Sequence, residues 1–370
     1  MQMLRLFLFL CLSCAFALTC AAQERRAKDH TGLHPVPDAK GKWGFIDRAG
    51  RFRIPPQYDG AGEFSEGVAY VWKWEGNKRK NGIVDTDSKF DELQTNDYEI
   101  AFHDGLARVQ TPWTQERKYG YMDRSGRMVV EPQFFNSGHF SEGLAWVAVL
   151  KEREWLYGFI DKTGKFAIEP QFVYQPGDFV DGLAKVVGKF KSGFIDREGR
   201  YRITVDSEQS DAFFSEGLLA AVIQDDPPRG VYLDRDGKVV LEIPFWQQRT
   251  AWQRSLYTLR RQQLAPFREG LAAVLSFNKI GFIDRKGKVV IEPQFRGTHG
   301  FSEGLAAVKI IGNDGEYVWG YIDRAGNFAV APRFREARSF AGGLAQIVTF
   351  DGKQQLIDAS GKVVWQLSKS

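Results

Sequence analysis

Short apolar runs separated by polar turn signals extend through almost the whole chain. In the stretch 270–293, residues 271–275, 280–283 and 288–291 form apolar or β-branched runs bounded by Gly and Asp. Runs this short, with these boundaries, predict strands rather than helices. Asp284-Arg285-Lys286-Gly287 separates the last two runs. Asp first and Gly fourth is typical of a type I turn in which the glycine tolerates positive φ. The stretch predicts a three-stranded antiparallel meander.

This pattern recurs along the chain with a period of about 38 residues. A phrase of the type aromatic-Gly-aromatic-Ile-Asp occurs nine times, ending at Asp47, Asp85, Asp123, Asp161, Asp196, Asp234, Asp284, Asp323 and Asp358. A second phrase, Phe-x-Glu-Gly-Leu-Ala, occurs eight times, starting at Phe64, Phe102, Phe140, Phe179, Phe214, Phe267, Phe301 and Phe340. The apolar face of one such unit cannot be buried alone, so neighbouring units must cover it. The chain is therefore predicted to be an all-β tandem-repeat protein.

A third phrase follows the first and ends each unit. It reads Glu131-Pro132-Gln133-Phe134 in one unit and Glu292-Pro293-Gln294-Phe295 in another. Because proline has no N–H for a strand ladder, this segment should end the third strand or lie at a sheet edge. Together the three phrases resemble the bacterial WG-repeat family, named for its Trp-Gly dipeptide, over roughly residues 42–365. The resemblance implies an all-β repeat domain, often exported, with no established general activity. Literal Trp-Gly occurs only at Trp43 and Trp319.

The units can form an open stack or a closed ring. Nothing like Gly-Leu-Ala precedes Trp43, so the first unit is expected to lack its leading strand, whereas the last unit looks complete. The two ends therefore do not complement each other as the ends of a closed ring would. Nine units also exceed the usual four to eight blades of a propeller. The sequence favours an open, curved β-solenoid, with a closed propeller-like ring as the alternative.

The N-terminus has the pattern of an export signal at residues 1–22. Arg5 precedes an apolar run, and small residues end it before polar Gln23. The mature protein is expected in the periplasm or outside the cell, without a transmembrane segment; lipid anchoring at Cys20 is the less favoured alternative. Residues 23–40 are predicted to be a polar tether, and residues 41–370 the repeat array. The three cysteines all precede residue 23, so cleavage after Ala22 leaves no disulfide, thiol catalyst or cysteine metal site.

Charge and motifs exclude several classes of function. Without Arg5, 49 basic residues face 46 acidic ones, an excess too small to indicate nucleic-acid binding. No zinc, Walker or dinucleotide pattern occurs, and we expect no metal, no cofactor and no catalytic residue. Gly300-Phe301-Ser302-Glu303-Gly304 matches the G-x-S-x-G elbow of hydrolases, but it is one copy of the repeated Phe-Ser-Glu-Gly turn. Two groups of turn aspartates come closest to calcium loops, Asp234-Arg235-Asp236-Gly237 and Asp85-Thr86-Asp87, with two carboxylates each. Hydrogen-bonded hairpin turns are the preferred interpretation.

Acidic residues of the second phrase share one register. They are Glu66, Asp104, Glu142, Asp181, Glu216, Glu269 and Glu303. In a stack of units they would line one face, either as acceptors of local backbone hydrogen bonds or as an acidic stripe for a cationic partner. We prefer the local bonds, because a carboxylate present in almost every unit is a poor candidate for a single active site.

The sixth unit breaks the pattern with an insert at 242–266. Within it Trp252, Leu256 and Leu259 follow helical spacing. Insertions in repeat arrays often map to the binding face. The insert is either a short helix that fills a gap in the stack or a partner-binding element, whose candidate residues are Trp246, Trp252, Arg254 and Arg261.

Two functional classes follow from these observations. The favoured one is an exported, non-catalytic binding or scaffold protein of the cell envelope, expected to be monomeric, whose extended repeat surface binds a protein or a glycan. The alternative is an enzyme, or the accessory module of an enzyme, acting on envelope polysaccharide. No isolated acid/base pair supports the alternative.

Overall fold

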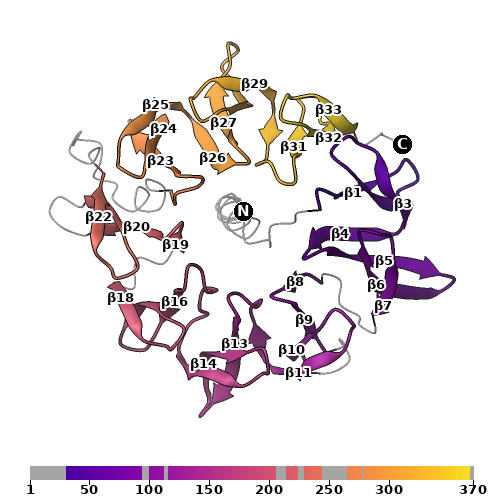
Figure 1. Ribbon diagram of the computed structural model, residues 1–370, viewed down its shortest axis with the longest axis vertical. Helices are drawn as coiled ribbons and strands as arrows, with labels where there is room; N and C mark the ends of the chain where they lie inside the picture. Colours follow the sequence, from indigo (N-terminus) through magenta and orange to yellow (C-terminus); the bar gives the residue numbers. More distant parts are fainter. Residues whose placement is uncertain are drawn as a thin grey trace, which may run out of the picture.

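The computed structural model of the protein describes residues 31–93, 100–111, 116–205, 214–223, 229–243, 265–276 and 279–366. These residues form nine antiparallel sheets. The sheets are arranged as blades around a central axis (Figure 1). The described part of the chain is therefore a nine-bladed β-propeller, with consecutive strands of each blade following one another outwards from the axis.

The first four blades comprise fifteen strands. They are β1 (His34–Pro37), β2 (Trp43–Ile46) and β3 (Phe52–Tyr58); β4 (Gly60–Ser65), β5 (Val68–Glu75), β6 (Lys78–Asp85) and β7 (Phe90–Leu93); β8 (Phe102–His103), β9 (Leu106–Gln110), β10 (Tyr119–Met122) and β11 (Met128–Phe134); and β12 (Asn136–Ser137), β13 (Leu144–Lys151), β14 (Glu154–Asp161) and β15 (Phe166–Phe172).

The fifth to ninth blades follow the same order. They contain β16 (Ala184–Val187), β17 (Ser192–Ile195) and β18 (Tyr201–Val205); β19 (Phe214–Ser215), β20 (Leu218–Ile223), β21 (Arg229–Leu233) and β22 (Val239–Glu242); β23 (Leu271–Ser276), β24 (Lys279–Asp284) and β25 (Val289–Phe295); β26 (Gly297–Ser302), β27 (Leu305–Ile311), β28 (Tyr317–Ile322) and β29 (Phe328–Phe334); and β30 (Glu336–Ala337), β31 (Ala345–Val348), β32 (Gln354–Ile357) and β33 (Val363–Gln366).

The predicted open β-solenoid is wrong, because the blades close into a ring. The expected absence of a leading strand in the first unit was the mistaken step. Gly32-Leu33-His34 stands where other blades have Gly-Leu-Ala, and β1 pairs with β2 so that Val36 faces Gly44. This strand lies within the stretch 23–40 that the sequence indicated as a tether. Prolines at 35 and 37 obscured it, but β1 is an end strand of its sheet, where proline is tolerated.

Side-by-side packing of the first and ninth blades closes the ring. A Cβ added at Gly50 would lie 2.5 Å from the carbonyl oxygen of Val364 in β33. Turn glycines of other blades also pack closely against the preceding blade. For example, a Cβ at Gly361 would lie 2.7 Å from Val330 Cγ1. Across the junction Arg48 Nε donates to the carbonyl oxygen of Gly342 at 2.8 Å. The first blade contains only strands β1 to β3 and the ninth only β30 to β33, so neither blade combines strands from both ends of the chain.

Six of the nine sheets have four strands, one more than predicted, and the extra strand is the innermost one. It carries the Phe of the second phrase in β4, β8, β19 and β26. In the fifth and seventh blades a single bridge takes its place, Val180 to Leu183 and Arg268 to Leu271. Four of these inner strands, β8, β12, β19 and β30, have only two residues each, too few to show the alternation of a strand in the sequence.

The hydrophobic core lies between blades, as the repeat argument requires. In one cluster Phe159 and Phe172 of the fourth blade pack with Phe179 and Ile195 of the fifth. The rings of Phe159 and Phe179 meet edge to face with centroids 4.9 Å apart, a favoured aromatic geometry. Every blade therefore depends on its neighbours for burial.

The glycine of the Trp-Gly phrase is required by a bulge in the outer strand. Trp43 pairs with Tyr58 but Phe45 pairs with Ile54, so extra residues, including Pro55 and Pro56, bulge opposite Gly44. A Cβ on Gly44 would lie 2.5 Å from the Ile54 carbonyl oxygen. The Pro-containing phrase thus lies on an edge strand, as predicted, and explains the glycine that faces it.

Gly287→Val is expected to lower the free energy of unfolding by about 1–3 kcal/mol. The predicted positive φ at this turn is confirmed, with φ +78° at Gly287 and +80° at Gly126. A Cβ at Gly287 would also lie 2.6 Å from Leu241 Cδ1 of the preceding blade. Urea unfolding followed by circular dichroism measures the change. Gly76→Val is a matched control, since its φ is also positive but no atom lies within 4 Å of its Cβ position; equal losses would show that backbone strain alone decides the effect.

Candidate functional site

The ring has two chemically different faces. Because consecutive strands are antiparallel, alternate connections of a blade emerge on opposite faces. The Phe-x-Glu-Gly turns and the Asp-x-x-Gly turns share one face, which we call the turn face. The hairpins between the two middle strands of each blade, together with the connections between blades, form the other, which we call the hairpin face.

On the turn face the repeated acidic residues join neighbouring blades. Each carboxylate accepts a hydrogen bond from the turn glycine N–H of the next blade, so it does not form the local bond expected from the sequence. The pairs are Glu66 with Gly105, Asp104 with Gly143, Glu142 with Gly182, Asp181 with Gly217, Glu216 with Gly270, Glu269 with Gly304, and Glu303 with Gly343, at donor–acceptor distances from 2.6 to 3.3 Å. The carboxylates are therefore structural links, not a free acidic stripe.

An arginine reinforces several of these links. It follows the turn aspartate of the next blade and reaches back to the same carboxylate. Arg124 Nη2 lies 3.0 Å from Glu66 Oε2, and Arg285 Nη1 lies 3.3 Å from Glu216 Oε2. The recurring Asp-Arg dipeptide is the sequence signal of this contact, but nothing within a single unit links it to the acidic residue of the preceding one.

The serine of the second phrase forms another link between blades. Ser302 Oγ donates to the carbonyl oxygen of Phe340 at 2.7 Å, and Ser141 Oγ donates to that of Phe179 at 2.7 Å. Strand β27 follows Ser302, in place of the helix that a hydrolase elbow opens. This supports the interpretation of Gly300–Gly304 as a repeated structural turn.

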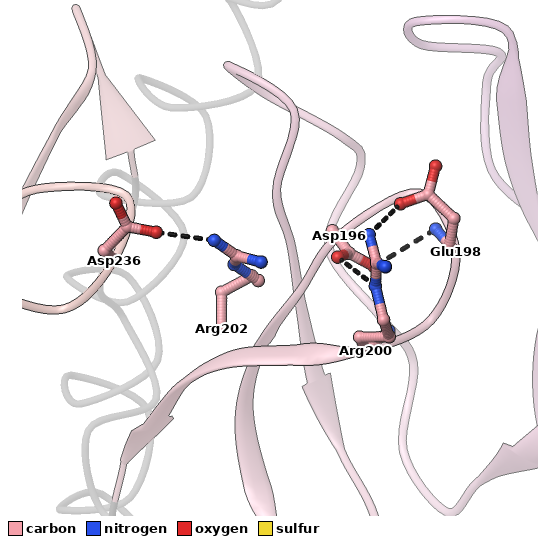
Figure 2. A network of polar contacts seen from close by, with 5 residues as sticks. All are labelled: Asp196, Glu198, Arg200, Arg202 and Asp236. Carbon is pink, nitrogen blue, oxygen red and sulfur yellow. Dashed lines mark hydrogen bonds and ion pairs between the residues drawn. The ribbon is translucent and has the colours of Figure 1, made fainter.

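The turn aspartates hold the Asp-x-x-Gly turns of the turn face through hydrogen bonds, which is the interpretation preferred over calcium binding. Asp196 Oδ1 accepts from the backbone N–H groups of Glu198 and Arg200 at 3.1 and 2.9 Å, and Arg200 Nε donates to Asp196 Oδ2 at 2.8 Å (Figure 2). Burial opposes ionisation here, but the backbone and guanidinium hydrogen bonds lower the pKa of Asp196 overall. In the next blade Asp236, one of the suggested calcium ligands, is bound by Arg202 Nη2 at 2.6 Å (Figure 2).

The hairpin face gathers exposed apolar side chains. Of the fifteen large apolar side chains that are exposed within the described ranges, nine lie on hairpins or connections of this face: Trp74, Phe135, Leu150, Trp155, Tyr174, Phe190, Ile311, Tyr317 and Phe350. The others lie on outer strands near the turn face. Exposed apolar side chains concentrated on one face are typical of interaction surfaces.

Cations accompany several aromatic rings on this face. Phe135 and Trp155 are 42% and 40% exposed, with ring centroids 4.1 Å apart. Lys118 Nζ lies 4.7 Å from the Phe135 centroid. On the eighth blade Lys309 Nζ lies 4.8 Å from the ring of Tyr317. The hairpin face thus combines aromatic rings with lysine ammonium groups, a combination enriched where proteins bind partners.

Two histidines meet between the third and fourth blades. The ring centroids of His103 in β8 and His139 in the fourth blade lie 4.4 Å apart. Burial, His103 and Arg108 lower the pKa of His139 to about 3. Burial also lowers the pKa of His103, although Glu66, Asp178 and Asp104 oppose this shift. Both rings are therefore neutral near pH 7.

The histidine pair predicts a loss of stability in mild acid. The pKa of His139 falls from 6.5 to about 3 on folding, so between these values the unfolded chain binds the additional proton. Stability is then complete above pH 6.5 and declines as the pH falls. The urea midpoint should drop between pH 7 and pH 5, and His139→Gln should reduce that drop. The same pH dependence in both proteins would exclude His139 as its source.

The sequence-predicted binding residues Trp246, Trp252, Arg254 and Arg261 lie outside the described residues, as does the predicted signal at 1–22. The chain leaves the sixth blade at Ile243, whose N–H donates to the Gly230 carbonyl oxygen. The description resumes at Ala265, which leads into the seventh blade and whose carbonyl oxygen accepts from Tyr232 Oη of the sixth at 2.7 Å. Ile243 follows the end of β22 and Ala265 precedes β23, and both positions lie on the hairpin face.

Within the described ranges, no three His, Cys, Asp or Glu side chains come together as metal ligands. The same residues contain no helix that is long and apolar enough to cross a membrane.

Comparison with known proteins supports the fold and the family. A crystal structure of the eukaryotic initiation factor aligns with 90% of this chain and 94% of its own at 13% identity, with a TM-score of 0.56. BamB from Moraxella catarrhalis aligns with 91% of this chain and 96% of its own at 12% identity, with a TM-score of 0.35. At these identities the first likeness concerns the fold alone, and the second carries no argument. No curated protein matches the sequence.

The family model of the WG containing repeat matches five stretches of the chain. They are residues 43–71, 119–149, 157–187, 280–313 and 319–353. Each match begins at the residue before the glycine of the first phrase and extends into the next blade. The matches therefore cover the same repeated bulge, turn and glutamate phrases that build the ring. The chain belongs to the WG-repeat family.

Proposed function

We propose that the protein is an exported, non-catalytic binding or scaffold protein of the cell envelope, and that its hairpin face binds a protein or glycan partner. The observation that carries the proposal is the concentration of exposed aromatic and aliphatic side chains on that face. The repeated carboxylates and serines of the turn face are engaged in holding blades together, so they do not supply a reactive group. Export rests on the N-terminal signal pattern.

The most developed part of this face is the aromatic pair of the fourth blade. Phe135 lies on the connection entering the blade, and Trp155 lies beside the tip of the β13–β14 hairpin, opposite Leu150 in register. Leu150 is 58% exposed. A rigid aromatic pair with an adjacent aliphatic side chain and Lys118 can bury apolar area at little conformational cost. The attachment of the 244–264 segment on the same side makes Trp246, Trp252, Arg254 and Arg261 proposed extensions of this surface.

The test is capture from envelope extract by the immobilised mature chain, with the bound material analysed for both protein and glycan. The double substitution Phe135→Ala, Trp155→Ala is expected to reduce capture at least tenfold and to leave the melting temperature nearly unchanged, because both side chains are exposed. Phe52→Ala is the matched control, since Phe52 is 41% exposed but lies on the outer strand β3 near the turn face. Equal capture by the double variant and the control would contradict binding at this face.

A variant lacking residues 246–264 tests the segment separately. Reduced capture with unchanged melting temperature supports a binding role for it. A lower melting temperature with unchanged capture indicates that the segment only supports the fold.

A further inference from the structure

The junction between the ninth and first blades is one of two that lack the linking carboxylate; the other, between the first and second blades, has Thr31 at the acidic position. At a regular junction, the carboxylate of one blade receives the turn glycine N–H and, in several cases, the arginine of the next blade. At the ninth blade the acidic position is Gly342, so no side-chain carboxylate is available. The first blade nevertheless keeps both partners of that carboxylate, the turn glycine Gly32 and the arginine Arg48.

The geometry at this junction follows that of the others. Gly342 has φ +61°, in the same left-handed region as Glu66 at +52° and Glu303 at +53°. Arg48 lies over the ninth-blade turn, because a Cβ at Gly343 would be 2.6 Å from its Nε. The equivalent Arg197 lies 3.2 Å from the Cβ position of Gly143. The backbone and guanidinium are thus placed as at other junctions, but the His34 ring lies 3.1 Å from the Cβ position of Gly342, where a built-in glutamate side chain would begin.

The guanidinium borders an open depression of about 290 Å³, lined by Thr31, Gly32, Asp47, Arg48, Ala49 and Arg51. Arg48 Nε donates a hydrogen bond to the Gly342 carbonyl oxygen. Asp47 is engaged by its own turn and by Arg51, whose Nη2 lies 3.0 Å from Asp47 Oδ2. The lining contains two arginines and one aspartate, so its net charge is positive and favours binding of an anion.

We propose that this depression is a binding site for an acidic side chain of a partner protein, which pairs with Arg48 as Glu66 pairs with Arg124 and Glu216 with Arg285. A bidentate guanidinium contact to a carboxylate is strong and directional. The molecule itself defines the ligand class, because the same constellation elsewhere holds the carboxylate of a polypeptide. The site lies on the turn face and does not depend on the proposed role of the hairpin face.

Titration of the full mature chain with a capped Gly-Glu-Gly peptide tests the proposal, with a capped Gly-Gln-Gly peptide as the neutral probe. The glutamyl peptide is expected to bind at least tenfold more tightly than the glutaminyl one. Arg48→Gln should weaken the glutamyl peptide at least tenfold. Arg124→Gln is the matched control: it removes the same arginine from a junction that already has Glu66, and it should leave peptide affinity unchanged.

A second variant guards against loss of binding through unfolding. Gly342→Glu with His34→Ala supplies the junction with its own carboxylate; the histidine change makes room, because a Cβ at residue 342 would lie 3.1 Å from the His34 ring. This variant should be more stable than the natural chain and yet fail to bind the peptide. Unchanged peptide affinity in Arg48→Gln or in the filled junction would overturn the proposal. So would Arg48-dependent binding of oligogalacturonate without binding of the peptide, since the ligand would then be a glycan.

Discussion

Gly158→Ala is expected to destabilise the protein by about 3 kcal/mol, more than most single methyl additions, because the methyl group collides with backbone. The alanine Cβ would lie 2.6 Å from the carbonyl oxygen of Ile168 and 2.8 Å from the nitrogen of Pro170. Neither atom can move unless the outer strand leaves its bulge, where Tyr157 pairs with Phe172 and Phe159 with Ile168. The effect should appear in urea unfolding as a lower midpoint.

The control for this experiment is Gly62→Ala in β4. There the nearest atom to the added Cβ is the Tyr70 carbonyl oxygen at 3.6 Å, an ordinary contact. We expect a change within about 0.5 kcal/mol. A loss at residue 158 as small as that at residue 62 would show that the bulge does not require the Trp-Gly glycine.

Glu216→Ala is expected to cost about 1.5–3 kcal/mol, the range for hydrogen bonds to a charged group. Glu216 accepts from the N–H of Gly270 at 3.1 Å and faces Arg285 Nη1 at 3.3 Å. Truncation leaves both donors of the seventh blade without that acceptor. Because the link joins the sixth and seventh blades, hydrogen exchange of the Gly270 amide should accelerate together with the global loss.

Glu303→Ala provides the internal comparison. Glu303 accepts from the N–H of Gly343 at 2.8 Å, but Ala359 follows the turn aspartate of its neighbouring blade where Arg285 occurs in the seventh. Its truncation should cost less than that of Glu216. If the two losses are equal, the arginine adds nothing to the link and the glycine N–H accounts for all of it.

The strands, turns and repeat were predictable because their signals are local. Asp284 to Gly287 indicates its turn within four residues, and positive φ at Gly287 follows directly. The family resemblance was confirmed for the same reason, since its phrases recur often enough to be recognised despite divergent units.

Closure and the links between blades were not predictable, because they join residues distant in sequence. Arg48 and Gly342 are separated by 294 positions. Each is an ordinary residue for its own turn, so neither indicates a distant partner. The first blade was misjudged because His34 and two prolines replace the usual residues while Val36 keeps its buried position. The acidic register was visible, but its acceptor role involves a glycine about 40 residues away, and only the packing of consecutive blades places the two together.

The construction of every blade from one uninterrupted piece of chain has a consequence for how such proteins change over generations. A propeller that shares one blade between its two ends must preserve both halves of that blade whenever the number of repeats changes. Here, duplication or deletion of a segment of about 38 residues adds or removes a complete blade, and only the packing angle has to adjust. Joining the old termini and opening the chain at another hairpin should likewise yield a circular permutant with the same ring.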